Sequence, residues 1–173
     1  MRGPGRANSA HRRAHGQQGS NLVEMAIVVP VLLLIVFGLI EFGFAINHNI
    51  DVTQGVREGA RQGAVANFSG GIGACTGGSP TDQLVCFTKN RVGLDTAQTY
   101  VQVLAPNNSV GQSFSVCASY PVQSLTGLLA PFLSGRFLHS EVTMRLEQAP
   151  ATGLTTGGDA PAPGDSAGWS WCT

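Results

Sequence analysis

The feature that most constrains this chain is an apolar run from Leu22 to Ile46, in which the only charged residues are Glu24 and Glu41. A bilayer core of roughly 30 Å needs about 20 apolar residues at a rise of about 1.5 Å each. A core helix of a soluble domain would show a polar face, which this run lacks. The run therefore predicts a membrane-spanning helix. Glu41 falls near its far end, where a position at the membrane interface is favoured over a contact with a partner.

The residues after the run predict that the helix continues outside the membrane. No strong stop signal occurs from Asn47 to Ala66, and apolar residues recur at three-to-four spacing with one longer step, as in a helix covered on one face. These residues are Ile46, Ile50, Val56, Ala60 and Ala64. One rod from Ser20 to Ala66 would be about 70 Å long, so roughly half of it must pack on something outside the bilayer.

Chain length and charge limit the remaining possibilities. The chain has 173 residues, which leaves about 100 outside the leader and the rod, enough for one small domain. The formal net charge is zero, so no overall field favours nucleic acid as a partner.

Charge is distributed unevenly about the run. Four arginines and no acid precede it, and this predicts a cytoplasmic N-terminus with the bulk of the chain across the membrane. The arginines are Arg2, Arg6, Arg12 and Arg13. All the cysteines follow the run, on the side where disulfides persist. They are Cys75, Cys86, Cys117 and Cys172.

The residues at the start of the run indicate a processing site. Residues 1–19 are basic and without apolar periodicity, which predicts a leader or a disordered cytoplasmic arm. Gly19, followed by Glu24 and an apolar helix, resembles type IV prepilin leaders. Cleavage after Gly19 would make Ser20 the new N-terminus, and Glu24 would pair with that amine in a neighbouring subunit and fix axial register. The alternative is that Glu24 sits near the cytoplasmic interface and that Gly19 is only a flexible joint.

The wider segment resembles the TadE-like family of tight-adherence (Tad, or Flp) pilus proteins, which are minor pilins or pseudopilins. The matching stretches are Gly19, Val23–Ala26, Val29–Leu33, Glu41–Gly43 and Val56–Arg61, and Met144–Glu147 resembles the family's terminal strand. Met25 departs from the pattern, since related leaders often carry an aromatic residue after the glutamate.

This resemblance implies a non-enzymatic bacterial protein that acts in pilus assembly or adhesion. The implied partners are the membrane, the major pilin, a companion minor pilin, the inner-membrane assembly platform and the prepilin peptidase. The implied location is the inner membrane, with a single span and the possibility of incorporation in the pilus. A protein of another class, an unprocessed single-pass scaffold of the assembly or secretion machine, remains the alternative.

Gly55, Gly59 and Gly63 form one bare stripe along the rod. Each glycine costs roughly 0.8 to 1 kcal/mol relative to alanine in a helix, so the spacing predicts a close neighbour. The candidates are the protein's own sheet, which we favour, and another helix with small-residue packing.

The residues after the rod predict an α+β domain over 67–148 with about three antiparallel strands. Ser79 and Pro80 begin a short helix or turn over Pro80–Val92. Strands are expected at Thr99–Leu104, Ser113–Val122 and Phe137–Glu147. Gln123–Leu133 predicts a short apolar helix capped near Ser124. A position on the membrane surface is the less favoured reading of this segment, because it lacks a basic face.

Residues 149–173 predict a flexible tail that ends in Trp-Ser-Trp-Cys and returns to the domain. Four cysteines allow three pairings, and we favour Cys75 with Cys86 and Cys117 with Cys172. His11 and His15 have helical spacing but no further ligands nearby, so no metal site is expected. No cofactor motif or catalytic spacing indicates an enzyme.

Overall fold

The computed structural model describes residues 15–65, 68, 71–107, 109–127, 129–148 and 153–173, and of residues 15–20 it describes the backbone only. The leader expected over residues 1–19 therefore lies mostly outside the described residues. The chain divides into two compact units, Met1–Ile40 and Glu41–Thr173.

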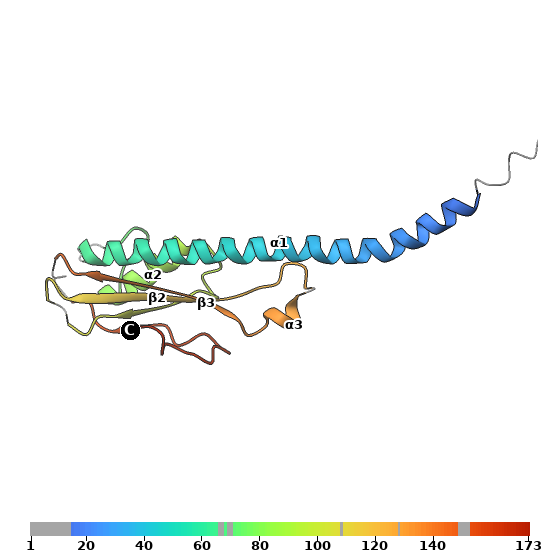
Figure 1. Ribbon diagram of the computed structural model, residues 1–173. Helices are drawn as coiled ribbons and strands as arrows, with labels where there is room; N and C mark the ends of the chain where they lie inside the picture. Colours follow the sequence, from blue (N-terminus) through green and yellow to red (C-terminus); the bar gives the residue numbers. More distant parts are fainter. Residues whose placement is uncertain (1–14, 66–67, 69–70, 108, 128, 149–152) are drawn as a thin grey trace, which may run out of the picture. The chain divides into compact units, whose positions relative to one another are not determined.

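Helix α1 (His15–Val65) runs without interruption from the first unit into the second (Figure 1). The predicted long helix is thus confirmed, and it begins five residues earlier than the expected Ser20. Pro30 lies inside it. The compact second unit begins at Glu41 and not after the helix, because the later turns of α1 belong to the core of that unit.

The second unit is built on a four-stranded antiparallel sheet with the strand order β3-β2-β1-β4. The strands are β1 (Tyr100–Leu104), β2 (Ser113–Pro121), β3 (Phe137–Arg145) and β4 (Gly157–Gly158). The first three are the predicted strands, so the predicted α+β class is confirmed. The fourth was not expected, and β4 lengthens the sheet by pairing with Gln102 and Val103 of β1.

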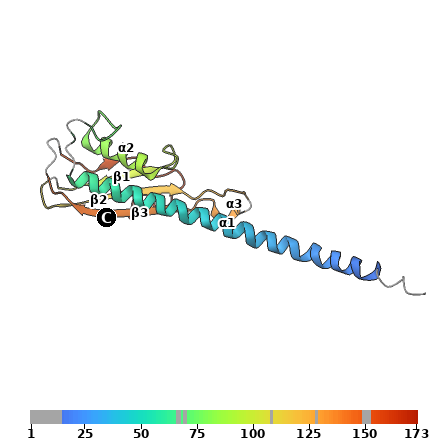
Figure 2. The same ribbon diagram turned by 90° about the horizontal axis from the view of Figure 1, so that it is seen from above.

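Two helices cover one face of this sheet (Figure 2). From α1 the core receives side chains at four-residue spacing, namely Val52, Val56 and Ala60, which are fully buried, and Ala64. They pack with alternate residues of β2, including Phe114 and Val116. This covered face explains the apolar periodicity seen in the second half of the helix.

Helix α2 (Pro80–Val92) has the predicted bounds because its ends carry strong local signals. Ser79 is the N-cap, and its hydroxyl accepts a bond from the backbone N–H of Asp82 while Asp82 accepts one from the backbone N–H of Ser79. This reciprocal arrangement is a capping box. Gly93 ends the helix in the left-handed conformation, with φ of 71°, which glycine adopts without steric cost.

The C-terminal segment covers the opposite face of the sheet, so the expectation of a flexible tail is wrong for its described part (Figure 1). Leu154 and Ala162 are buried, and the backbone N–H of Asp159 donates to the carbonyl of Val101 over 2.9 Å. The Thr156 hydroxyl accepts from the backbone N–H of Ala105. Local composition predicted flexibility, but pairing with β1 gives the backbone partners that composition does not reveal.

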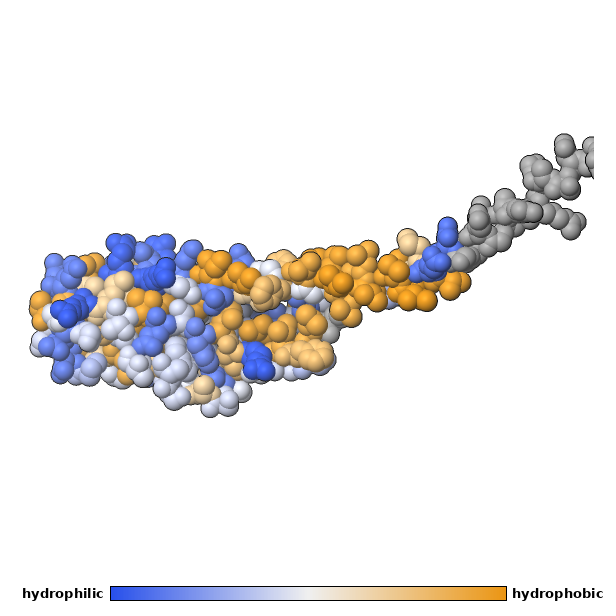
Figure 3. All heavy atoms as spheres, viewed as in Figure 1, coloured by the Kyte–Doolittle hydropathy of each residue, from blue (hydrophilic) through white to orange (hydrophobic). Residues whose placement is uncertain are grey.

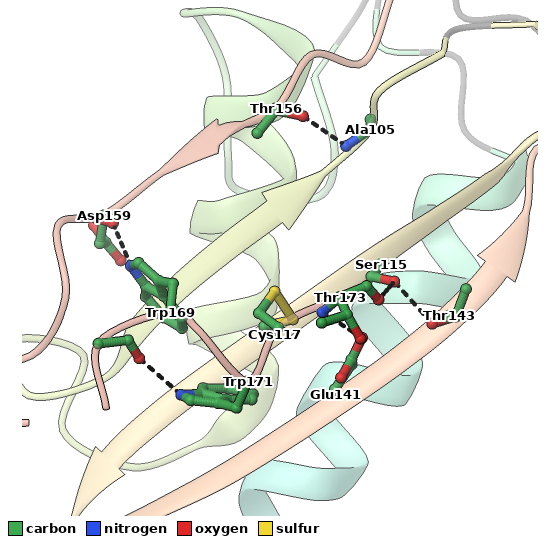
Figure 4. Close-up of a disulfide and its surroundings, with 12 residues drawn as sticks. Ala105, Ser115, Cys117, Glu141, Thr143, Thr156, Asp159, Trp169, Trp171 and Thr173 are labelled. Atoms are coloured by element: carbon green, nitrogen blue, oxygen red, sulfur yellow. Dashed lines mark hydrogen bonds between the residues drawn. A yellow bond between two sulfur atoms is a disulfide. The ribbon is translucent and has the colours of Figure 1, made fainter. Parts of the chain in front are cut away.

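Strand β2 is consequently buried on both faces. On the face under the C-terminal segment, the Ser115 hydroxyl donates to the carbonyl of Thr173, and Cys117 is bonded to Cys172 (Figure 4). The return of the tail to the domain is therefore as expected, although the path is ordered.

The connection between β2 and β3 differs from its prediction. A helix was expected over Gln123–Leu133, but α3 is a single turn at Ala130–Leu133. Ser124 does not cap it. The hydroxyl of Ser124 instead donates a hydrogen bond to Glu41 of α1.

Candidate functional site

The first unit carries an apolar surface that nothing in its described part covers. Between Leu22 and Ile40 all large hydrophobic side chains are exposed, from Leu22 at 72% to Val29 at 37%. Helix α1 over Asn21–Val65 is long and apolar enough to cross a membrane, and it is the one such helix in the described chain. Its hydrophobic surface in the first unit is visible in Figure 3. A protein with this surface fits a single membrane span.

The expected processing site falls at the start of α1. Gly19 and Ser20 are both helical, and their side chains lie outside the described residues. Glu24 follows within the apolar surface and is exposed. Its expected role in subunit register stays a prediction.

Glu41, at the beginning of the second unit, is a buried carboxylate of α1. It is only 4% exposed. Ser124 Oγ donates to it over 2.8 Å, the backbone N–H of Thr126 donates over 3.1 Å, and the Thr126 hydroxyl donates as well. The favoured interpretation of Glu41 as a plain interface residue is thus incomplete, because the carboxylate binds the β2–β3 connection of its own chain.

The partners of Glu41 were missed by the sequence interpretation. Ser124 and Thr126 lie 83 and 85 residues away in the chain. Their local pattern with Gly127 is typical of a turn, and the Ser124 hydroxyl does accept from the backbone N–H of Gly127. Nothing in that pattern indicates which carboxylate the turn binds.

The glycine stripe is a close-packing surface, but its main neighbour is helix α2 and not the sheet. A Cβ atom added at Gly55 would lie 2.5 Å from Val92 Cγ2 and 2.6 Å from the backbone nitrogen of Val92. One at Gly59 would lie 2.2 Å from Thr88 Oγ1. The sheet is therefore the wrong partner at these two positions.

Only the third glycine meets both layers. A Cβ at Gly63 would lie 2.9 Å from Leu84 Cδ2 on α2 and 2.9 Å from Phe114 Cε2 on β2. The stripe thus packs inside the second unit, where side chains larger than hydrogen would separate the two helices.

Two disulfides tie the second unit together. One joins Cys75 to Cys86 across 11 residues and the other joins Cys117 to Cys172 across 55 residues. The first joins the loop after α1 to α2, and the second joins the end of the chain to β2, one of the two inner strands. These links suit an oxidising compartment.

A serine, a histidine and an aspartate also meet beneath the sheet, but not in the order that activates a nucleophile. His139 Nε2 lies 2.7 Å from Asp165 Oδ2, and Ser119 Oγ donates to that same oxygen over 3.2 Å. In a catalytic triad the histidine stands between the other two groups. Here the aspartate does, and Ser119 is buried.

This cluster binds the C-terminal segment, through Asp165, to β2 and β3. Burial favours the neutral acid, but hydrogen bonds from His139, from the backbone N–H of Ala167 and from Ser119 more than offset it and lower the pKa of Asp165. The His139 ring also stacks on Trp171, with ring centroids 4.4 Å apart. No group of three or more potential metal ligands occurs among the residues that the structure describes.

The family comparison decides what the helix is. The family model described as TadE-like protein matches residues 19–61. Residues 19–61 are a TadE-like segment. No curated protein and no solved structure gives a match to the chain.

The TadE-like segment covers about a quarter of the chain and contains the exposed apolar surface from Leu22 to Ile40. It includes Gly19, Glu24, Glu41 and the first two glycines of the stripe, whereas Gly63 and the four cysteines lie outside it. This part of the chain is therefore similar to TadE-like proteins. The sheet, α2 and both disulfides belong to the part of the chain that the family comparison does not reach.

Proposed function

We propose that this protein is a minor pilin or pseudopilin-like component of a Tad (Flp) type IV pilus, acting in its assembly or in adhesion. The observation that carries the proposal is the coincidence of the TadE-like segment with an apolar helix that has no cover from Leu22 to Ile40. Such a surface requires lipid or other apolar helices around it. A subunit that moves from a membrane into a fibre meets both surroundings in turn.

The proposed topology places the arginine-rich N-terminus in the cytoplasm and the second unit across the inner membrane. The excess of Arg before the span supports this orientation. The two disulfides of the second unit support it independently, because they persist outside the cytoplasm.

The proposed route has three steps. A prepilin peptidase removes the leader after Gly19, and Ser20 becomes the N-terminus. Glu24 then pairs with the new amine of a neighbouring subunit, in an apolar fibre core where an unpaired charge is costly. The partners in this route are the major pilin, a companion minor pilin and the inner-membrane assembly platform.

The second candidate is a permanently anchored scaffold that is never cut. One observation favours it: α1 begins at His15 and continues through Gly19 and Ser20 without a break. A peptidase would have to open this turn to reach the bond between them. Both candidates are non-enzymatic.

Intact mass of the membrane-extracted chain separates the two candidates. A mature chain that begins at Ser20 supports the pilin, and a chain that retains residues 1–19 supports the scaffold. In cells that make pili, Glu24→Ala should reduce the amount of this protein in sheared filaments while membrane insertion is unchanged. Asp51→Ala is the matched control, since it removes a carboxylate of the same helix outside the apolar surface. Equal incorporation of the two variants would remove the proposed role of Glu24.

A further inference from the structure

The β2–β3 connection is a second apolar surface, separate from the helix of the first unit. Leu125 is 63% exposed and Phe132, in α3, is 77% exposed. Figure 3, drawn in the same view as Figure 1, shows hydrophobic atoms gathered around α3 at one end of the second unit. Exposed apolar side chains that gather in one patch mark a site of interaction with protein or membrane.

The position of this connection relative to the bilayer follows from its bonds to Glu41. The exposed apolar run from Leu22 to Ile40 extends about 28 Å as a helix, which is close to the hydrocarbon thickness. Glu41 is the next residue, so it lies at the membrane surface when this run spans the bilayer. Ser124 and Thr126 are bound directly to the carboxylate of Glu41. The connection that they belong to is therefore held at the same level.

The neighbouring turn of α1 has the same character. Phe42 is 66% exposed and Phe44 is 45% exposed, although both lie in the second unit. A pocket opens between α1 and the connection, and its lining includes Phe44, Ser124 and Leu125. The carboxylate of Glu41 in this region has hydrogen-bond donors within the protein, because it accepts from the connection itself.

We infer that residues 125–127 and 129–133 form a membrane foot, in which Leu125 and Phe132 enter the boundary between lipid headgroups and acyl chains. The occupant of this surface is lipid. Apolar side chains at such a boundary reach roughly 5 to 10 Å into the bilayer. Exposed Arg136, which follows α3, adds one cation near lipid phosphates. The absence of a wider basic face fits a foot that is positioned by Glu41 and a covalently attached span and so needs little affinity of its own.

This inference rests on the proposed membrane span but not on the pilus role. It assigns Glu41 a positioning role: the carboxylate holds the foot at the lipid surface. An unheld connection would be free to leave the bilayer, since two apolar side chains give only weak binding.

A depth measurement on the full chain tests the foot. All four cysteines are in disulfides, so an introduced cysteine is the one free thiol. Leu125→Cys and Phe132→Cys carry an environment-sensitive fluorophore in bilayers of phosphatidylcholine and phosphatidylglycerol. The matched control is Val110→Cys, which replaces a side chain that is 59% exposed in the turn between β1 and β2. Lipids with a nitroxide near the headgroup end of the acyl chain are the quencher.

Quenching at positions 125 and 132 that is several-fold greater than at position 110 supports the foot. Equal quenching at all three overturns it. Protection from aqueous iodide without quenching by the lipid nitroxide also overturns it, because a protein surface would then be the occupant.

Two further variants distinguish a failure of the membrane span from a failure of the foot, and test the role of Glu41. Val31→Cys, in the apolar run, reports the span: if it too escapes lipid quenching, the membrane span fails and the proposed function with it. If Val31→Cys is quenched and positions 125 and 132 are not, only the foot fails. Glu41→Ala combined with Phe132→Cys should lower the quenching toward that of Val110→Cys, and unchanged quenching would overturn the positioning role of Glu41.

Discussion

The two halves of helix α1 have the same backbone and opposite environments. In the first unit Val36 is 41% exposed and Leu39 is 67% exposed. In the second unit Val52 and Val56 are fully buried and face the sheet. The first half is apolar all round and has no cover in its unit, whereas the second half is apolar on one side and supplies a core.

This difference shows that hydrophobicity and burial are separate properties of a helix. The more hydrophobic half contributes nothing to the folded core of the second unit, and the less hydrophobic half organises it. The first half depends on the surrounding lipid or on other subunits for its stability. The second half depends on α2, on the sheet and on the covalent links that hold them.

The largest expected effect comes from removing the link between Cys117 and Cys172. The double variant Cys117→Ala/Cys172→Ala should lose about 4 kcal/mol of unfolding free energy, and the variant without Cys75–Cys86 about 3 kcal/mol, because the closed loops differ in length. Urea titration of the full chain in detergent micelles, followed by near-UV circular dichroism, measures both. The far-UV helix signal that remains after the transition should be the same in both variants, since the first half of α1 is held by the micelle. Loss of that signal together with the near-UV signal would show that the two halves are not independent.

The next effect concerns the glycines of α1, some of which lie against α2 while others have no neighbour within 4 Å. Gly55→Ala places a Cβ 2.5 Å from Val92 Cγ2 and against the Val92 backbone. Overpacking of this kind costs about 1 to 3 kcal/mol, which exceeds the gain of up to about 1 kcal/mol in helix propensity. Gly43→Ala is the control, because a Cβ there meets nothing within 4 Å. The same urea titration should show destabilisation by the first and none by the second, and equal effects would contradict the close approach of α2.

A comparison of two valines sharpens the contrast further. Val56→Ala removes two buried carbon groups at about 0.8 kcal/mol each and leaves a small cavity, so about 2 kcal/mol of unfolding free energy should be lost. Val36→Ala removes the same atoms from the exposed surface of the first unit and should leave the unfolding of the second unit unchanged. Thermal denaturation in micelles, with the two variants measured side by side, checks this. A shift in the midpoint for Val36→Ala would mean that the first half does contribute to the core.

The sequence predicted those features whose causes lie close together in the chain. Helix α2 was placed at its true bounds because Ser79 and Pro80 mark its start within a few residues. The three longer strands follow from alternation within each segment. The glycine stripe predicted a close neighbour correctly, since spacing alone reveals a bare face.

Features that depend on distant residues were out of reach. The spacing of Gly55 and Gly59 does not say which element approaches them, and the sheet was favoured where α2 is the neighbour. The two-residue strand β4 has no alternation to detect, and only its pairing with β1 reveals it. The bond from Thr126 to Glu41 joins two segments that were predicted separately, as a short apolar helix and a membrane helix, respectively.

The smallest expected effect concerns the capping box of α2, the helix that makes the second half of α1 different from the first. Hydrogen bonds from the backbone N–H and the hydroxyl of Ser79 lower the pKa of Asp82 below its ordinary value. A carboxylate with a lowered folded-state pKa stabilises the fold above its unfolded pKa of about 4, and this contribution is lost as the pH falls through the folded-state pKa. Asp82→Asn should therefore cost about 1 kcal/mol or less at neutral pH, in keeping with a single cap. Urea titrations of both proteins at pH values from neutral to acid should converge as Asp82 becomes protonated in the unmodified chain. A difference that stays constant across this range would show that the charge of Asp82 does not stabilise α2.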